Sequence, residues 1–516
     1  MRHATDTTFW ALIADAAQRG SDRALLADEH GRSLTARQLH DEACATAAAL
    51  AERGIGAKTV VSWQLPTTLE TMVVMAALAR LGAVQNPIIP ILRENEVDFI
   101  TGQLATEFFV VPEVWRGFDH GGLARALAHD RGFEVITVDL MTPPTGGRLR
   151  LPRANTSALA PLPTPAGDTR WIYYSSGTTA APKGIRHSDA SLIAGSAAVV
   201  DMVGTTSSDV DPIAFPIAHI GGAAMLATSL LTGLRLALFE SFDPAKTPLA
   251  IAAHNPTFLG TATPFFVAFL DAQRAHGDRP LFPFLRGCLA GGAPITAELG
   301  RQVRDTFGLT GIANAWGLTE FPAATSPPLG APPEVLDHTV GAPVSGVSVR
   351  VVDNHEVEVP VGHEGELRLK GPQCFLGYVD ASLDADAFDK DGWLRTGDLG
   401  LIDADGHVRV TGRIKDAIIR NAENISALEV ENVLATHPTV ADVAVIGIPD
   451  PRTGERVCAV VVAAPAAEVS LESLVQHCRS HGLSRYKHPE HLVVVDELPR
   501  NQFGKVIKRD LRATFS

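Results

Sequence analysis

The sequence predicts an α/β protein. We expect a large N-terminal domain of several subdomains, in which β-sheets and helices form layers, and a small α+β unit at the C-terminus. Strand and helix patterns alternate through the first part of the chain, which favours mostly parallel sheets covered by helices. At about 100–200 residues per domain, the 516 residues predict two to four domains or subdomains. After about Gly412 the pattern changes, and the remaining ~100 residues are enough for a separate unit.

The first elements can be placed from their boundary residues. Thr35 is a capping residue for a helix that Gly54 ends, and the apolar run at 60–63 predicts a short buried strand. Pro66 is expected to start a second helix, which Gly82 closes. Residues 142–165 are rich in Pro, Thr, Gly and Ala and predict a surface connection.

The C-terminal unit is predicted from four segments. Residues 443–448 and 457–462 read as strands that flank a polar turn at 449–455, residues 471–481 as a helix, and residues 492–495 as a further strand. Strands and a helix in this order predict an α+β unit.

Composition narrows the class of protein. The chain is 46% hydrophobic and 20% charged, which is typical of a globular protein with a large core and excludes a disordered chain. The net charge of −14 argues against non-specific binding to nucleic acid or an anionic membrane. Small anionic ligands remain possible, because they respond to local charge. The sequence contains no run of about 18 apolar residues, so we expect no transmembrane helix.

The cysteines favour a reducing compartment. There are five, an odd number, and they form neither a CxxC pair nor a metal-ligand spacing. We therefore expect buried structural thiols and no disulfide framework. Residues 1–20 carry Arg, Asp and Gln among their apolar positions and lack the apolar core of a signal peptide. A cytoplasmic location is expected.

The segment at 173–184 contains the strongest chemical pattern. Its Ser, Thr, Gly and Lys residues follow an apolar strand and offer hydroxyls, backbone N–H groups and one cation, as phosphate oxygens require. It is not a Walker A loop, because Pro182 precedes Lys183 and no Ser or Thr follows it. Composition alone leaves a solvated Ser/Thr turn equally open.

This segment resembles the phosphate-binding signature of the adenylate-forming (ANL) superfamily, which comprises acyl-CoA synthetases, peptide-synthetase adenylation domains and firefly-type luciferases. Eight blocks of the sequence resemble the motifs of that superfamily in the same order. They lie at 173–184, 215–222, 290–294, 315–320, 365–378, 393–399, 412–425 and 499–505. Eight matches in order exclude chance.

The resemblance implies an AMP-forming acyl-CoA synthetase, an acid–thiol ligase. A carboxylic acid and ATP would give acyl-AMP and pyrophosphate, and acyl-AMP and coenzyme A would then give acyl-CoA and AMP. ATP and CoA are the implied co-substrates and Mg²⁺ the implied metal, and a homodimer is possible.

The resemblance also implies roles around the nucleotide. Trp316 would stack on adenine, Thr319 would contact the α-phosphate, Glu320 would hold Mg²⁺, and Asp398 and Arg413 would contact the ribose. The other implied ATP or AMP positions are Ser175, Ser176, Gly177, Thr178, Thr179, Lys183, Gly291, Gly292, Ala293, Pro294, Ala315 and Gly317, with Thr178 also near Mg²⁺.

Two lysines are implied in catalysis and in domain motion. Lys505 would bridge the attacking carboxylate and the α-phosphate, and with Thr319 and Glu320 would form the catalytic set. Lys415 matches the hinge of the superfamily, so the implied domains are 1–411 and a mobile 417–516, joined by a hinge at 412–416. After the swing, the implied CoA-side residues are Arg420, Glu423, Asn424, Tyr486 and Lys487.

The implied acyl pocket consists of neutral and mostly small residues, so we expect an apolar acid of the medium-chain, alicyclic or aromatic kind. Its positions are His219, Ile220, Gly221, Gly222, Thr261 and Gly291.

Alternatives remain at this point. An amino-acid adenylation domain would carry Asp after Phe215, where this chain has Pro216. An acyl-AMP ligase that loads a carrier protein, or a luciferase-like oxygenase, would differ in its dependence on CoA. A non-catalytic nucleotide-binding protein would lack Lys505 or Glu320, and both are present.

The chain departs from the superfamily pattern at three positions. Ala180 replaces a usual Gly, and Asn421 and Ala422 replace a common Gly-Gly pair. The first change narrows the backbone choices of the phosphate loop, and the second bears on the contacts of the thioester stage.

Overall fold

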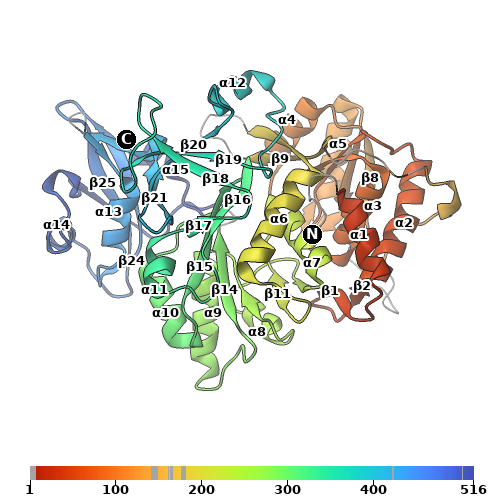
Figure 1. The fold of residues 1–516 in the computed structure, drawn as a ribbon, viewed down its shortest axis with the longest axis horizontal. Coiled ribbons are helices and arrows are strands. Elements are labelled where there is room, and N and C mark those ends of the chain that lie inside the picture. The colour runs from red at the N-terminus through yellow and green to blue at the C-terminus, as the bar shows by residue number, and fades with distance from the viewer. Residues whose placement is uncertain are drawn as a thin grey trace.

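The computed structural model describes residues 7–140, 149–160, 162, 167–175, 182–420, 423–501 and 504–515. Helices and sheets of the N-terminal part form a large body, and the C-terminal part lies at one side of it (Figure 1). Among the described helices, none has the length and apolar character needed to cross a membrane.

The largest sheet is six-stranded and mostly parallel. Its order is β10 (Lys183–Ser188), β9 (Thr169–Ser175), β4 (Val84–Pro87), β3 (Val60–Trp63), β5 (Phe108–Pro112) and β8 (Glu134–Val138), and only β10 and β9 pair antiparallel. Alternate residues of β5 enter different cores: Phe108 and Val110 face the main core, whereas Phe109 and Val111 pack with α4 (Glu94–Leu104) and α5 (His120–Arg131). This sheet therefore has helices on both faces.

A four-stranded sheet and a five-stranded sheet complete the main core. Their orders are β11 (Val210–Ile213), β12 (Arg235–Leu238), β1 (Ala24–Asp28), β2 (Ser33–Thr35), and β13 (Phe258–Leu259), β14 (Gly287–Gly291), β15 (Ile312–Leu318), β16 (Phe321–Ser326), β17 (Ala342–Pro343). The accompanying helices are α1 (Phe9–Gln18), α2 (Ala36–Glu52), α3 (Leu69–Leu81), α6 (Asp189–Val203), α7 (Ile220–Thr232), α8 (Thr247–Ala252), α9 (Thr263–His276), α10 (Ala297–Phe307) and α11 (Pro333–His338).

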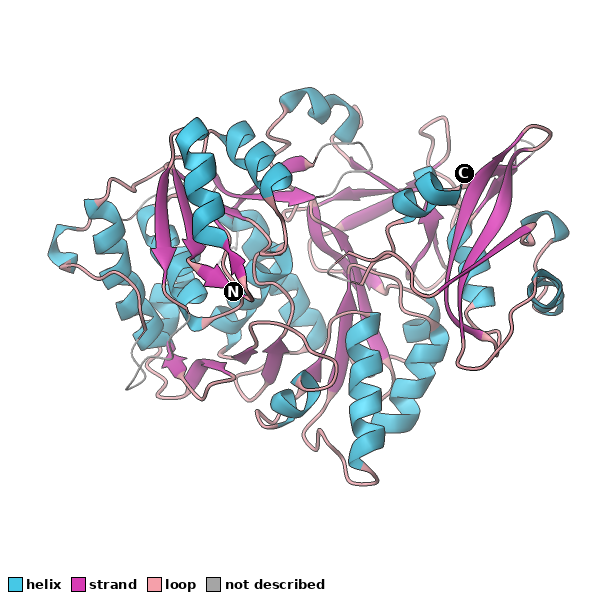
Figure 2. Ribbon diagram, turned by 180° about the vertical axis from the view of Figure 1, so that it is seen from behind, coloured by secondary structure: helices cyan, strands magenta, loops and turns pink. Residues whose placement is uncertain are grey.

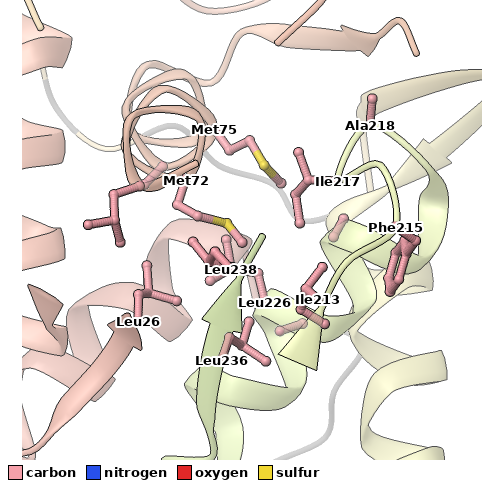
Figure 3. Close-up of a cluster of buried hydrophobic side chains, with 14 of the residues drawn as sticks. Leu26, Met72, Met75, Ile213, Phe215, Ile217, Ala218, Leu226, Leu236 and Leu238 are labelled. Carbon is pink, nitrogen blue, oxygen red and sulfur yellow. The ribbon is translucent and has the colours of Figure 1, made fainter. Parts of the chain in front are cut away.

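One hydrophobic cluster joins several of these elements. Met72 and Met75 of α3 lie against Ile213 and Leu238 of the four-stranded sheet and against Ile217, which follows β11 (Figure 3). Each of these side chains is almost fully buried. The segment implied in acyl binding is thus seated directly on the core.

A fourth, antiparallel sheet leads toward the C-terminal part, and its hydrophobic core also includes Ile185 of β10 and Phe321 of β16. It consists of β18 (Ser348–Val352), β19 (Gly365–Lys370), β20 (Leu394–Ile402) and β21 (Val408–Arg413). The short elements of the N-terminal part are β6 (Val114–Trp115), β7 (Phe118–Asp119), η2 (Thr156–Ala158), η3 (Ala381–Leu383) and α12 (Asp384–Ala387).

The C-terminal part, seen from behind in Figure 2, has one sheet with a hydrophobic core on each face. Val445 of β24 enters one core, whereas Ala444 and Ile446 enter the other, as a two-sided strand requires. All members of both cores lie at or beyond Ile418. The elements are η4 (Ile414–Asp416), β22 (Ile418–Arg420), β23 (Glu423–Ile425), α13 (Ala427–Leu434), β24 (Val440–Asp450), β25 (Gly454–Ala463), α14 (Leu471–Ser480), η5 (Arg485–Lys487), β26 (His491–Val495) and α15 (Lys508–Phe515).

The structure confirms the α/β class and most of the expected elements. Thr35 caps α2, and Gly82 ends α3 in the left-handed conformation. The start of the second helix was wrong, because Thr68 caps α3 and Pro66 lies two residues before that cap. The turn at 449–455 was too long, because β24 and β25 pair up to Asp450 and Gly454.

Candidate active site

Two of the predicted site residues form the tip of the hairpin of β15 and β16, two strands that are labelled near the middle of Figure 1. Strands β15 and β16 pair up to Leu318 and Phe321, so Thr319 and Glu320 make a two-residue turn, here named the 319–320 turn. The hairpin is tight at Gly317, where an added Cβ would lie 2.6 Å from the backbone nitrogen of Ala323. Glycine is required there because the two chains approach too closely for a side chain.

Three hydrogen bonds from outside the hairpin hold this turn. The His187 Nε2 lies 2.7 Å from the Thr319 carbonyl oxygen, and the Phe375 N–H donates to the Glu320 carbonyl oxygen over 2.9 Å. The Tyr378 hydroxyl donates to Glu320 Oε1, also over 2.9 Å. Both the backbone and the carboxylate of the turn are therefore fixed.

His187 is fully buried, and burial lowers its pKa to about 4, although the bond to Thr319 acts in the opposite direction. The ring is therefore neutral near pH 7. Since a carbonyl can only accept, Nε2 carries the proton and Nδ1 accepts from the Ser191 hydroxyl over 3.0 Å.

Asp398 lies on β20 at the centre of a second group. The indole N–H of Trp316 donates to its Oδ2 over 2.8 Å, and Arg413 Nε forms an ion pair with its Oδ1, also at 2.8 Å. Asp398 is 3% exposed, and its Oδ1 has no well-oriented hydrogen bond from any described residue. A buried carboxylate oxygen in this state suits a ligand with hydroxyl donors. Trp316 is itself only 8% exposed.

Lys505 reaches this group from the C-terminal part. Burial is the main cause that lowers its pKa, to about 8, with repulsion from Arg413 and Lys415 in addition, while Asp398 and Asp416 oppose the shift. The pKa of Lys415 is also lowered, mainly by burial and secondly by the charge of Arg413. The charge of Lys183 lowers it further. Arg413 of β21 pairs with Asp398, and the charge of Asp398 affects the pKa of both Lys415 and Lys505. Cations from β21, η4 and the C-terminal part are therefore close to this carboxylate, as an anion site requires.

The loop that carries Lys505 is seated on the start of α9. Gly504 has a φ of 74°, and an added Cβ there would lie 2.6 Å from Cγ of Pro264. The backbone N–H of Lys505 donates to the Asn501 side chain over 3.0 Å, which closes the loop locally. The predicted catalytic lysine therefore lies against the N-terminal part.

The segment implied in acyl binding is fixed by its backbone. His219 caps α7, and its Nδ1 accepts from the Gly221 N–H over 3.2 Å. Burial lowers the pKa of His219 to about 4, so this ring is also neutral. An added Cβ at Gly222 would lie 2.0 Å from the Ile217 carbonyl oxygen. The Thr67 hydroxyl donates to the Phe215 carbonyl oxygen and accepts from the Ile217 N–H.

The end of β14 contacts Thr261, another of the implied acyl-pocket positions. Gly291 pairs with Ala315 in the sheet, and its N–H donates to the Thr261 carbonyl oxygen over 3.2 Å. Asn314 donates to the Ala293 carbonyl oxygen. The implied acyl and adenine sides are therefore neighbours. Gly292 and Pro294 follow β14, and Ile220 begins α7.

Part of the predicted phosphate-binding segment lies outside the described residues. Ser175 ends β9, whereas Ser176, Gly177, Thr178 and Thr179 lie outside the described residues, as do Ala180, Asn421 and Ala422.

The implied CoA-side residues belong to the C-terminal part. Arg420 is paired with Glu490 at 2.8 Å and Lys487 with Glu429 at 2.6 Å, while Tyr486 is exposed. Glu423 and Asn424 lie in β23.

The sequence assigned no role to four residues that contact the predicted site residues or their segments: His187, Thr67, Pro264 and Tyr378. The sequence offered one indication for each of two of them. His187 lies four residues after Lys183, and Tyr378 ends the motif block at 365–378. Thr67 and Pro264 gave none, because their partners are distant in sequence.

Comparison with known proteins gives a consistent result. Residues 13–379 match the family described as AMP-binding enzyme, and residues 429–505 match the AMP-binding enzyme C-terminal domain. The medium-chain fatty-acid–CoA ligase of Escherichia coli is 32% identical over 500 residues, which cover 95% of this chain and 87% of that one. The salicyl-AMP ligase / salicyl-S-ArCP synthetase of Mycobacterium tuberculosis is 32% identical over 514 residues, with 97% and 90% covered.

Solved structures agree with this. ATP-bound MatB from Rhodopseudomonas palustris superposes with a TM-score of 0.87 at 28% identity, with 99% of each chain covered. The apo form of the same protein gives a TM-score of 0.78.

Proposed function

Because the chain belongs to the family of AMP-binding enzymes, we propose that its site converts a carboxylic acid and ATP into acyl-AMP and pyrophosphate, and then passes the acyl group to the thiol of CoA. The observation that carries this function is the group around Asp398. A buried carboxylate oxygen suited to ribose lies among cations suited to phosphate, and one of these cations, Lys505, comes from the C-terminal part.

In the first step, the site residues would hold the carboxylate substrate and ATP, both of which are anions, next to each other. Asp398 and Arg413, which form an ion pair, would hold the ribose. Lys183 would contact the phosphates. Lys505 neutralises the negative charge that develops as the acid attacks the α-phosphorus. Thr319 contacts the α-phosphate. The predicted set of nucleotide-binding residues stays a proposal, and the contacts of Asp398 support it.

The carboxylate oxygens of Glu320 are suitable ligands for Mg²⁺. Its carboxylate is half-buried, and since Tyr378 occupies only Oε1, oxygen lone pairs of the kind that Mg²⁺ prefers remain. Bound Mg²⁺ would neutralise charge on the triphosphate during the attack.

We propose an apolar acid as substrate. The described residues of the acyl segment are neutral: His219 is uncharged near pH 7, and its neighbours are apolar or glycine. An ionised second group on the substrate would lack an opposite charge there, and its desolvation would cost several kcal/mol. Medium-chain, alicyclic and aromatic acids fit this environment.

For the second step we propose a rotation of residues 417–516 about a hinge at 412–416 that includes Lys415. The rotation would withdraw Lys505 and bring the CoA-side residues, Arg420 among them, to the site. The higher TM-score with ATP-bound than with apo MatB supports an adenylation-ready arrangement here. A carrier-protein thiol is the second candidate acceptor, which the salicyl-S-ArCP synthetase favours. A homodimer and a cytoplasmic location also stay predictions.

The test is a panel of medium-chain, alicyclic and aromatic acids with ATP, Mg²⁺ and CoA. We expect AMP, pyrophosphate and acyl-CoA in equal amounts. Formation of ADP and phosphate would contradict the proposal. A parallel assay with a phosphopantetheine-bearing carrier protein distinguishes the two acceptors.

A further inference from the structure

Strand β10 forms backbone hydrogen bonds along both of its edges. One edge pairs with β9. On the other edge, the Arg186 N–H donates to the Gly377 carbonyl oxygen, the Arg186 carbonyl oxygen accepts from the Leu376 N–H, and Gly184 accepts from Val379. Segment 376–379 therefore extends the sheet beside β10, although it is far away in sequence.

This pairing brings two side chains to the 319–320 turn. His187, near the end of β10, contacts the Thr319 carbonyl oxygen at 2.7 Å. Tyr378, in the paired segment, donates to the Glu320 carboxylate at 2.9 Å. Lys183, at the start of β10, has its Nζ 5.3 Å from the centre of the Tyr378 ring. A single strand thus connects the lysine with both supports of the turn.

We propose that His187 and Tyr378 are positioning residues that hold the 319–320 turn in register with Lys183, His187 through the backbone of Thr319 and Tyr378 through the carboxylate of Glu320. The inference rests on the proposed function, because it gives that turn the α-phosphate and Mg²⁺ contacts.

The physical need for such support follows from the geometry of the turn. A two-residue turn is fixed by its strands only up to Leu318 and Phe321, and a Glu side chain has several rotamers. Binding Mg²⁺ with a carboxylate in one orientation would otherwise require that orientation to be selected at the moment of binding. The Tyr378 bond selects it beforehand and leaves the other carboxylate oxygen for the metal.

The two residues make different predictions. Tyr378→Phe keeps the ring that packs on Phe375 and faces Lys183, and removes only the hydroxyl. Loss of a hydrogen bond to a charged group should weaken the Mg²⁺-dependent part of ATP binding by about 10- to 100-fold. ATP binding without Mg²⁺ should stay at the wild-type level.

His187 acts on the backbone, so its loss should lower kcat for acyl-AMP formation even at saturating Mg²⁺. His187→Leu removes the donor, and His187→Gln keeps an N–H that can reach Thr319. We expect a fall of about 10-fold or more for the first variant and substantial recovery in the second.

The experiment combines calorimetry of ATP binding, with and without Mg²⁺, with single-turnover acyl-AMP formation. Ser382→Ala and His120→Gln are matched controls. Ser382 loses a hydroxyl that donates to the carboxylate of Asp380, and His120 is a second buried neutral histidine, paired with Gln64. Both controls should keep the wild-type dependence on Mg²⁺.

The outcomes separate the two proposals. If the wild type binds ATP without any effect of Mg²⁺ and forms no acyl-AMP, both the proposed function and this inference are wrong. If the wild type behaves as proposed but Tyr378→Phe retains wild-type Mg²⁺ dependence and His187→Leu retains wild-type kcat, only the positioning role is overturned. Equal loss in His187→Leu and His187→Gln would overturn the role of the His187 N–H.

Discussion

At the scale of single residues, the lysine at 505 depends most on its surroundings. In solution a lysine near a C-terminus is a hydrated cation with an ordinary pKa. Here burial, with Arg413 and Lys415 nearby, brings its pKa down to about 8. The ammonium group stays charged near neutral pH, although burial and the nearby cations destabilise the charged form. A bound anion would stabilise it.

Lys505→Ala should therefore separate the two half-reactions. Acyl-AMP formation should fall about 10²- to 10³-fold, because a donor aimed at the developing charge is lost. Conversion of supplied acyl-AMP and CoA into thioester should stay close to wild type, because we propose that this step uses the other orientation of residues 417–516, in which Lys505 is withdrawn. Two single-turnover assays on one preparation measure this. Loss of both steps in a folded protein would contradict the proposed alternation.

The lowered pKa of Lys505 also predicts a pH dependence. Since the charged form exists below the pKa, the free enzyme loses this cation as the pH rises through about 8. The kcat/KM of acyl-AMP formation should decline above that pH, because it reports groups of the free enzyme. In Lys505→Arg the decline should move to higher pH, since a guanidinium remains protonated. An identical decline in both proteins would assign the titration to another group.

At the scale of elements, the hairpin of β15 and β16 is limited by backbone approach at Gly317. Gly317→Ala would place a methyl group 2.6 Å from the Ala323 nitrogen and should displace the turn. We expect a loss of about 1–3 kcal/mol in unfolding free energy, as for overpacking, together with slower acyl-AMP formation. Denaturant unfolding and the adenylation assay measure both effects.

Gly56→Ala is the control for Gly317→Ala, because an added Cβ there meets nothing within 4 Å. It should unfold at the wild-type denaturant concentration and adenylate at the wild-type rate. If both variants behaved like wild type, the hairpin would have to be more adaptable than its geometry indicates.

The elements also show what sequence could predict. Thr35 and Gly82 marked helix ends because capping is local. The extent of β24 and β25 was underestimated, because polar residues at 449–455 resemble a loop and only cross-strand pairing extends the ladder to Asp450. Asp398 was predicted as a site residue from its motif block, and the structure shows that it is buried and contacts Trp316 and Arg413. The contact of His187 with the 319–320 turn could not be predicted, because the two residues that form it are 132 positions apart in the sequence.

At the scale of the whole molecule, the contact between Gly504 and Pro264 joins the two parts of the chain. An added Cβ at Gly504 would lie 4.0 Å from Cβ of Pro264, a separation suited to a disulfide. A double variant, Pro264→Cys with Gly504→Cys, should therefore lock the arrangement when oxidised.

The oxidised double variant should form acyl-AMP and fail to convert it with CoA, and a reducing agent should restore the second step. Each single-cysteine variant serves as a control and should complete both steps under oxidising conditions. The native thiols are buried or half-buried, which limits competing pairs. Thioester formation by the fully cross-linked protein would show that the second step needs no rotation.

Arg413 lies between the predicted nucleotide site and the proposed hinge. It pairs with Asp398 across β20 and β21, and η4, with Lys415, begins at the very next residue. Nucleotide recognition and rotation would therefore share one short stretch of backbone, and by thermodynamic reciprocity each must act on the other. The factor by which a bound nucleotide favours one orientation is the factor by which that orientation tightens its hold on the nucleotide. A difference in this factor between ATP and acyl-AMP would be enough, without any further messenger, to change which orientation the enzyme prefers.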